Sequence, residues 1–245
     1  MLVLYTLVTT NIASLSVSIY LHRELTHGSV ALSGISRSFF RFVIYFITGM
    51  DPVEWRLVHL EHHRAPADSP DDPHSPKNEG MWHIVLIGVW YYIKAAKRMH
   101  KEVDAEHKVS GDILGRQPLR YLGIIANLAL NIYLWGTLLG IIVWAIQLAW
   151  IPFWAAGVVN GLGHGAHEKD AHTKDLSTDI LHDSSPVLRV LLNVITAGES
   201  NHHAHHLRQG SARLTMTAGE FDWGFTVVRM LARLHLAKIL HVYEA

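Results

Sequence analysis

Apolar residues form a few long uncharged runs along this chain. The first run, residues 1–21, has about the 20 residues that a helix needs to cross the hydrocarbon core of a membrane. From Tyr121 to Val159 a further 39 residues carry no charged side chain, enough for two spans joined by a tight turn near Gly136 to Gly140. The pattern predicts three membrane-spanning helices, over about residues 1–21, 121–140 and 141–159.

Two shorter apolar stretches lie between these spans. The first, about residues 38–50, is interrupted by Arg41 and is too short to cross a bilayer. The second, about residues 82–98, begins aromatic and apolar and ends basic, which is typical of a helix at the membrane surface. We therefore predict two interfacial helices here, and an amphipathic helix over residues 221–240 on a polar cap.

The composition favours a single membrane domain over residues 1–245. Hydrophobic residues make up 49% of the chain and charged residues 17%, and the mean hydropathy is +0.17. These values are too apolar for an ordinary soluble domain and too polar for a protein made only of spans. We predict an all-α integral membrane fold, a few-span helical bundle with a helical cap. The positive-inside rule predicts that the cap is cytoplasmic, at the inner membrane if the protein is bacterial.

Charge and cysteine content exclude several function classes. Lys plus Arg and Asp plus Glu number 21 each, so no net field attracts nucleic acid, and nucleic acid is not an expected partner. The chain has no cysteine, which excludes disulfides, thiolate metal sites and a catalytic thiol. Any metal must therefore be bound by nitrogen or oxygen, and the 19 histidines become the outstanding feature.

Ten histidines are concentrated at four places, each close to a predicted span or interfacial helix. The candidate ligands among them are His22 and His27; His59, His62 and His63; His164, preceded by Asn160; and His202, His205 and His206. An α-helix turns by about 100° per residue, so each H-x-x-H-H cluster is expected to converge on one face. Nine ligands exceed the roughly four to six that one transition metal takes, which favours a site with two metal ions.

Other histidines and aromatic residues are given simpler interpretations. His22 and His27 lie about 140° apart on an α-helix, so we expect them to bind different metals or to lie on either side of a helix end. His203 is expected to point away from its cluster. Trp55, with Trp82 and Trp90, is expected to anchor the chain at the membrane interface. The remaining histidines are expected to lie at the surface, or in the core with their hydrogen bonds satisfied. They are His74, His83, His100, His107, His167, His172, His182, His235 and His241.

The order of the histidine motifs resembles that of the membrane fatty-acid desaturases of the stearoyl-CoA and bacterial delta-9 type. Smaller matches support the resemblance: Glu54-Trp55, Asp72-Pro73-His74 and Gly198-Glu199 each flank a histidine cluster. The resemblance implies a cytosolic cap over a narrow acyl tunnel, and a di-iron centre that Asn160 contacts through water. The implied iron ligands are His22, His27, His59, His62, His63, His164, His202, His205 and His206.

The resemblance also implies an activity, that of an oxygen-dependent desaturase placing a cis double bond, at the delta-9 position, in an acyl-CoA or acyl-lipid chain. The implied cofactors are two iron ions, with molecular oxygen as co-substrate. The implied partners are the fatty-acyl substrate, an electron donor of the ferredoxin or cytochrome b5 type, and the lipid bilayer. Only one predicted span precedes His22, where the family commonly has a hairpin. Departures from the family pattern at Gly28 and Leu60-Glu61 leave the acyl carrier and the double-bond position open.

Two alternative functions fit parts of the same pattern. A related iron centre on this scaffold could hydroxylate or oxidatively decarboxylate a fatty acid or alkane, and product analysis separates these reactions from desaturation. The second alternative is a histidine-rich metal-binding or transport protein of the membrane, for which polar or ionisable residues would be expected along a pathway through the membrane. The predicted hairpin contains no ionisable group, and its polar side chains are few, which argues against a transporter; they are Asn127, Asn131, Thr137 and Gln147.

Overall fold

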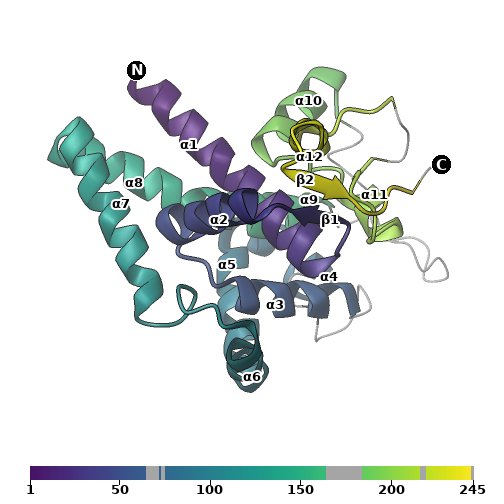
Figure 1. Ribbon diagram of the computed structural model, residues 1–245, viewed down its shortest axis with the longest axis horizontal. Coiled ribbons are helices and arrows are strands. Elements are labelled where there is room, and N and C mark those ends of the chain that lie inside the picture. The colour runs from purple at the N-terminus through teal and green to yellow at the C-terminus, as the bar shows by residue number, and fades with distance from the viewer. Residues whose placement is uncertain (65–71, 73–74, 164–183, 216–218, 244–245) are drawn as a thin grey trace.

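Helices form almost all of the secondary structure of this chain (Figure 1). A computed structural model describes residues 1–64, 72, 75–163, 184–215 and 219–243. The helices of the first half are α1 (Leu2–Ser16), α2 (Gly34–Val43), α3 (Pro52–Arg64), α4 (Pro76–Glu79), α5 (Met81–Arg98) and α6 (His100–Ser110). The helices of the second half are α7 (Leu119–Trp135), α8 (Thr137–Ile151), α9 (Asn160–Gly163), α10 (Pro186–Ile195), α11 (His202–Leu207) and α12 (Trp223–Arg233). The predicted all-α class is confirmed.

Three helices continue beyond their α-helical part in the wider π-helical geometry. The continuations follow α1, α2 and α8 and cover Val17–Thr26, Ile44–Thr48 and Pro152–Val159. Two of the resulting helices, Leu2–Thr26 and Thr137–Gly163, are long and apolar enough to cross a membrane, and α7 is a shorter apolar helix. The first helix is therefore longer than predicted. The hairpin turns at Gly136, where φ is 76°, a conformation that glycine adopts without strain.

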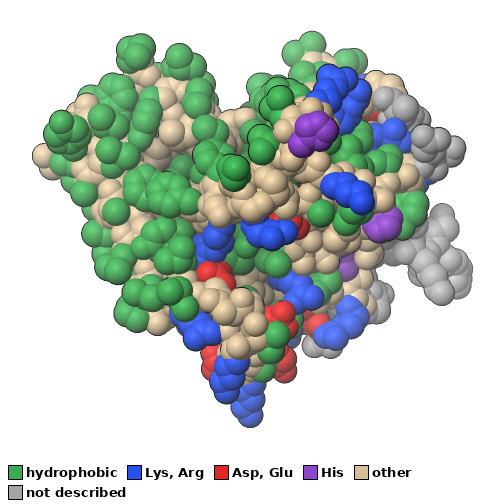
Figure 2. All heavy atoms as spheres, in the orientation of Figure 1, with side chains coloured by type: hydrophobic (Ala, Val, Ile, Leu, Met, Phe, Trp, Pro, Cys, Tyr) green, Lys and Arg blue, Asp and Glu red, His purple; other side chains and the backbone are tan. Residues whose placement is uncertain are grey.

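The α7–α8 hairpin packs closely and presents an apolar outer surface. A Cβ atom at Gly140 would lie 2.6 Å from the Asn131 carbonyl, so only glycine permits this approach. Buried polar side chains link the hairpin to α1: Asn127 donates to Gln147 at 2.9 Å, and Gln147 donates to Thr9 at 2.8 Å. In Figure 2 hydrophobic side chains cover the hairpin on the left, whereas charged side chains gather over α6 at the bottom.

The main hydrophobic core surrounds the end of the first long helix. Ile19 and Leu21 are completely buried there against Ile44 and Val228. Directly after this helix, β1 (Val30–Leu32) pairs with β2 (Ala237–Ile239) in an antiparallel two-stranded sheet. The sheet thus attaches the C-terminal segment to the residues that follow His27, and it was not predicted from the sequence.

The helix predicted over residues 221–240 ends earlier than expected. α12 stops at Arg233, and His235 adopts a left-handed φ of 57°. The backbone N–H of Leu236 donates to the carbonyl of Leu231 at 2.8 Å, which is the Schellman pattern that terminates helices. Glycine usually occupies the left-handed position, so a histidine there gave no signal of a helix end. The residues that follow form β2.

Helices occupy both stretches for which interfacial helices are predicted. α2 and its continuation cover Gly34–Thr48, and α5 covers Met81–Arg98. Trp82 and Trp90 on α5 are exposed, as expected of residues at a membrane interface. The depth of these helices in a bilayer stays a prediction.

Candidate metal centre

Eight of the nine histidines predicted as ligands come together in two adjacent groups. The five-histidine group consists of His22, His27, His59, His63 and His205. The three-histidine group consists of His62, His202 and His206. Within each group the candidate ligand atoms all lie within 4.8 Å of one another, and the rings of His63 and His206 connect the groups at 4.5 Å. His164 and the side chain of His203 lie outside the described residues.

The ring nitrogens face one another at the spacing of metal ligands. The Nε2 atom of His205 lies 2.9 Å from the Nε2 atoms of both His22 and His63. In the three-histidine group, the Nε2 atom of His206 lies 3.2 Å from that of His62 and 3.1 Å from that of His202. Two nitrogens that bind one ion at about 2.1 Å and at right angles are about 3.0 Å apart. The spacing therefore suits one metal ion in each group.

Carboxylates orient one histidine ring in each group. The Nδ1 atom of His22 donates to Glu199 Oε1 at 2.8 Å, and the Nδ1 atom of His62 donates to Asp72 Oδ1 at 2.9 Å. Because an ionised carboxylate only accepts, the proton must lie on Nδ1, and Nε2 is left as the metal-binding atom. The donor set thus fits the metal ions that the resemblance implies.

The π-helical segment at the end of α1 brings His22 and His27 into the same group. The backbone N–H of His27 donates to the carbonyl of His22 at 3.0 Å, five positions earlier. In this geometry a residue five positions away is about one turn away, whereas on an α-helix it would be about 140° away. His27 is the residue at which the helix ends, in agreement with the second of the two arrangements expected from the sequence.

Each H-x-x-H-H cluster contributes to both groups, whereas the sequence suggested that each cluster converges as one set. On α3, His59 and His63 belong to the five-histidine group, and His62 belongs to the three-histidine group. α11 is divided in the same way, because its i+3 member, His205, belongs to the five-histidine group, whereas His202 and His206 belong to the three-histidine group. Positions i+3 and i+4 of a helix differ by about 100° in direction. Both helices are therefore shared between two sites.

Burial keeps four rings of the five-histidine group neutral, those of His27, His59, His63 and His205. Burial, together with positive charge on neighbouring groups, lowers the pKa of His27 from 6.5 to about 2. Burial also lowers the pKa of His59, His63 and His205 well below the ordinary value, and the neighbouring histidines lower it further. Neutral imidazole is the form that binds a metal, so these four rings are in their binding form at neutral pH.

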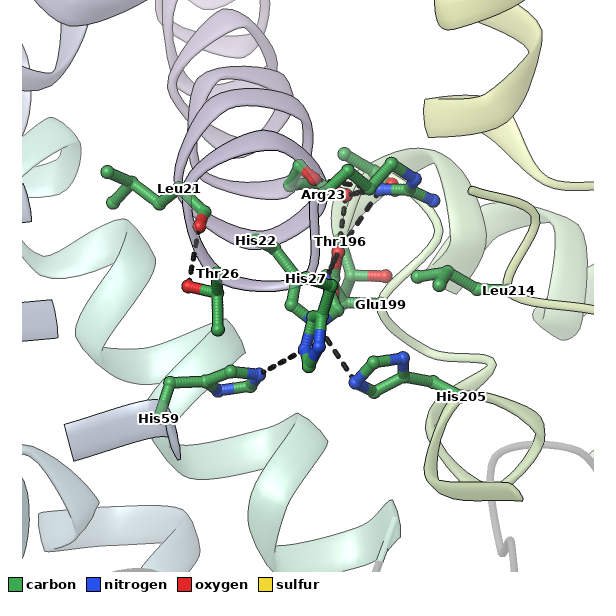
Figure 3. A network of polar contacts seen from close by, with 12 residues as sticks. Leu21, His22, Arg23, Thr26, His27, His59, Thr196, Glu199, His205 and Leu214 are labelled. Atoms are coloured by element: carbon green, nitrogen blue, oxygen red, sulfur yellow. Dashed lines mark hydrogen bonds and ion pairs between the residues drawn. The ribbon is translucent and has the colours of Figure 1, made fainter. Parts of the chain in front are cut away.

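Charged side chains behind the five-histidine group form a buried network (Figure 3). Glu199 lies between His22 and Arg23, and Arg23 also contacts Asp222. Burial raises the pKa of the Glu199 carboxyl, but the charges of its neighbours and its hydrogen bonds lower that pKa below the usual value. Arg23 and Asp222 were not predicted as functional residues, because 199 positions separate them and neither belongs to a recognised histidine spacing.

A small apolar pocket lies beside both groups. Its volume is about 110 Å³, and its walls include His59 from one group, His202 from the other, and Asn160. Trp55 also lines the pocket and stacks on His59, with ring centroids 4.6 Å apart and an interplanar angle of 12°. The interpretation of Trp55 as an interfacial anchor is therefore wrong, since this side chain packs against the candidate centre.

The sequence also resembles known desaturases over most of its length. An acyl-CoA 5-desaturase of Anemone leveillei is 31% identical over 226 residues, which cover 88% of this chain and 64% of the relative. A delta-9 acyl-lipid desaturase of Arabidopsis thaliana is 26% identical over 235 residues, which cover 94% of this chain and 72% of the relative. An icosanoyl-CoA 5-desaturase of Limnanthes douglasii is 28% identical over 228 residues, which cover 91% of this chain and 60% of the relative.

The chain spans between 60% and 72% of the length of these three relatives. The model of the family described as fatty acid desaturase matches residues 1–213, a range that includes every histidine of both groups. The two long apolar helices agree with a membrane protein. This chain therefore belongs to the fatty acid desaturase family.

Proposed function

We propose that this protein is an oxygen-dependent desaturase that places a cis double bond in a fatty-acyl chain at a di-iron centre. The observation that supports the proposal is the apolar pocket that contacts both histidine groups, because an acyl chain in this pocket would lie beside both ions. The proposed iron ligands are the histidines of both groups together with His164, and Asn160 is proposed to contact an iron through water.

Iron is the metal that agrees best with the donors and the family. Imidazole binds iron, zinc and copper, but zinc has no redox chemistry and could not serve a reaction with oxygen. Membership of the desaturase family favours iron over copper. When bound, the iron pair would supply the oxidising power to remove hydrogen from an unactivated methylene group.

The side chains of this protein would orient the acyl chain and keep water out. Val58 and Val89 make the pocket wall apolar, and Trp55 fixes the His59 ring by stacking on it. A narrow apolar wall would hold one carbon pair near the centre and limit competing reactions with water. Glu199 and Asp72 would keep the Nδ1 protons in place while the Nε2 atoms bind the metals.

The overall reaction requires an external electron donor. Loss of two hydrogen atoms from the acyl chain supplies two electrons and two protons. Two further electrons from the donor, with two protons from water, complete the reduction of one oxygen molecule to two water molecules. We propose a donor of the ferredoxin or cytochrome b5 type, a multi-pass single domain, and a cytoplasmic cap. The separation of apolar and charged surfaces in Figure 2 supports an apolar part within the membrane and a polar cap outside it.

The position of the double bond and the acyl carrier belong to the same proposal. We propose the delta-9 position and an acyl-CoA or acyl-lipid substrate. The relatives named above include acyl-CoA and acyl-lipid desaturases, and delta-9 and 5-desaturases. Mapping the double bond in the product decides between the positions.

The experiment is expression in a host with a simple fatty-acid profile and a co-expressed electron donor, followed by gas chromatography and mass spectrometry of the lipids. We expect a new monounsaturated species that is absent with His62→Ala and present with His100→Ala. His100 is a matched control because it is an exposed histidine on α6. Hydroxylated or shortened products would contradict desaturation and show that the protein catalyses the alternative oxidation. An unchanged profile with iron bound and the donor present would contradict both.

A further inference from the structure

Arg23 is a buried arginine whose donors are all used. Its side chain is 1% exposed, although it lies next to His22 in sequence. The Nε atom donates to the Ala212 carbonyl at 2.8 Å, and Nη1 donates to the Ser18 carbonyl at 3.0 Å and to its hydroxyl. Nη1 also reaches Glu199 Oε1 at 3.3 Å. A side chain held at this many points has one orientation only.

On its other side Arg23 binds Asp222, the residue directly before α12. Its Nη2 atom lies 3.2 Å from both carboxylate oxygens of Asp222. Asp222 also accepts from the backbone N–H groups of Phe225 and Leu214, both at 2.8 Å, so it caps α12. Arg23 therefore connects the carboxylate that orients His22 to the first turn of α12.

Two glycines leave the space that the guanidinium occupies. A Cβ atom at Gly224 would lie 2.9 Å from Arg23 Nη1 and 2.3 Å from the Ala197 carbonyl oxygen. A Cβ atom at Gly198 would lie 2.4 Å from Asp222 Oδ1, and the φ of Gly198 is 95°. A larger residue at either position would displace the network, so the fold is shaped around this arginine.

The charges explain why the network needs a cation. The carboxylate of Asp222 is buried and that of Glu199 is only 14% exposed, and Arg23 contacts both. Without it, two negative charges with little access to water would lie behind one face of the five-histidine group. Lysine would be a poor substitute, because a single ammonium cannot bind two carboxylates and a carbonyl in the fixed directions of a guanidinium.

We propose that Arg23 is a positioning residue of the metal centre, which holds the Glu199 carboxylate against His22 and thereby sets the affinity of the five-histidine group for its metal. The inference rests on the proposed function, because it requires a metal in that group. Arg23 acts through Glu199 and does not itself touch the metal. The three-histidine group, which is oriented by Asp72, is independent of it.

The test measures metal binding and does not depend on activity. Cobalt(II) is titrated into the purified, metal-free full-length protein, and its visible absorption reports both sites. Arg23→Gln is expected to weaken one of two cobalt sites by about 10–100-fold and to leave the other unchanged. Arg23→Lys, which keeps the charge, is expected to show the same selective loss. This variant replaces Arg23→Gln in the test if Arg23→Gln does not fold. Arg37→Gln is the control, since Arg37 is an exposed arginine bonded to Glu24.

Two further variants separate positioning from simple stabilisation. Glu199→Gln should weaken the same site, and the double variant Arg23→Gln/Glu199→Gln should lose no more affinity than the worse single variant, because both act on one contact. Asp222→Asn should lower the melting temperature of the metal-free protein and change neither affinity by more than about threefold, since Asp222 does not contact His22.

The outcomes distinguish this inference from the proposed function. If the wild-type protein binds no cobalt, the metal centre is wrong and the role of Arg23 fails with it. If the wild type binds two ions and folded Arg23→Gln binds both with unchanged affinity, the role of Arg23 fails while the metal centre stands. Additive losses in the double variant would also overturn the inference, because Arg23 would then act independently of Glu199.

Discussion

At the residue scale, the contact between His62 and Asp72 makes a specific prediction for the three-histidine group. Asp72→Asn removes the charge that fixes the Nδ1 proton of His62. We expect the affinity of this group for its metal to fall about 10–100-fold, while the five-histidine group keeps its affinity. Metal titration of the purified variant measures both.

Asp104→Asn is the matched control for this experiment, because Asp104 is an exposed aspartate on α6. An equal loss at both metal sites of Asp72→Asn would contradict the prediction, since it would indicate general disruption of the cap.

The sequence identified the histidines but not the groups into which they assemble. Spacing selected His59, His62 and His63 because positions i, i+3 and i+4 share one side of a helix. Spacing could not show that His62 turns toward a different partner set, because that depends on where α11 packs. Arg23 had no recognisable signal, since its partners Glu199 and Asp222 are brought to it only by the tertiary fold.

At the scale of elements, a polar contact inside the apolar region joins three helices. Gln147 of α8 accepts from Asn127 and Asn131 of α7 and donates to Thr9 of α1. Gln147→Leu removes the hydrogen bonds that Gln147 makes with Asn127, Asn131 and Thr9, so we expect it to cost about 1–2 kcal/mol. The melting temperature in detergent should fall by about 2–8 °C, with cobalt binding unchanged.

Ile146→Leu provides the comparison on the same helix, because it is a conservative change at a partly exposed neighbour of Gln147. Equal melting temperatures for the two variants would show that the polar contact does not stabilise the packing of these helices.

A second prediction at this scale concerns the β1–β2 pair. A chain that ends at Leu236 lacks β2 and the hydrogen bonds from Leu240 to Ser29 and from Ala212 to His241, each 2.9 Å. At about 1 kcal/mol for each net hydrogen bond, the melting temperature should fall by at least about 4 °C. A chain ending at Tyr243 serves as the control. Equal stability of the two chains would mean that the strand pair contributes nothing.

The elements themselves were predictable to different degrees. Uncharged runs located the long helices and the hairpin, because membrane-spanning length depends only on local composition. The π-helical segment before His27 was missed, since it has no compositional signature and the spacing was read at 100° per residue. The strand pair was missed because Val30–Leu32 and Ala237–Ile239 are short and far apart in sequence.

At the scale of the whole molecule, the buried histidines make the stability of the metal-free protein depend on pH. In the unfolded chain, histidines take up protons below a pKa near 6.5, whereas in the folded chain the lowered pKa values of His27, His59, His63 and His205 prevent this. The unfolded state therefore binds more protons at acid pH. Stability should fall as the pH drops below about 6.5, by up to about 1.4 kcal/mol per pH unit for each histidine.

Thermal unfolding of the metal-free protein between about pH 7.5 and pH 5.5 measures this effect. His100→Ala, which removes an exposed histidine, should show the same pH dependence as the wild type. A melting temperature that stays constant over this range would mean that the buried rings accept protons in the folded protein.

The five-histidine group also constrains how the protein is made. His22 and His205 touch but are 183 positions apart, so at about 5–20 residues per second a ribosome needs roughly 9–37 s to synthesise the segment between them. During that interval His22 and, once they are synthesised, the histidines of α3 lack their partner from α11. The complete set of ligands for this metal therefore exists only after α11 has been synthesised. A chain terminated before α11 would present an incomplete ligand set with less selectivity among metal ions.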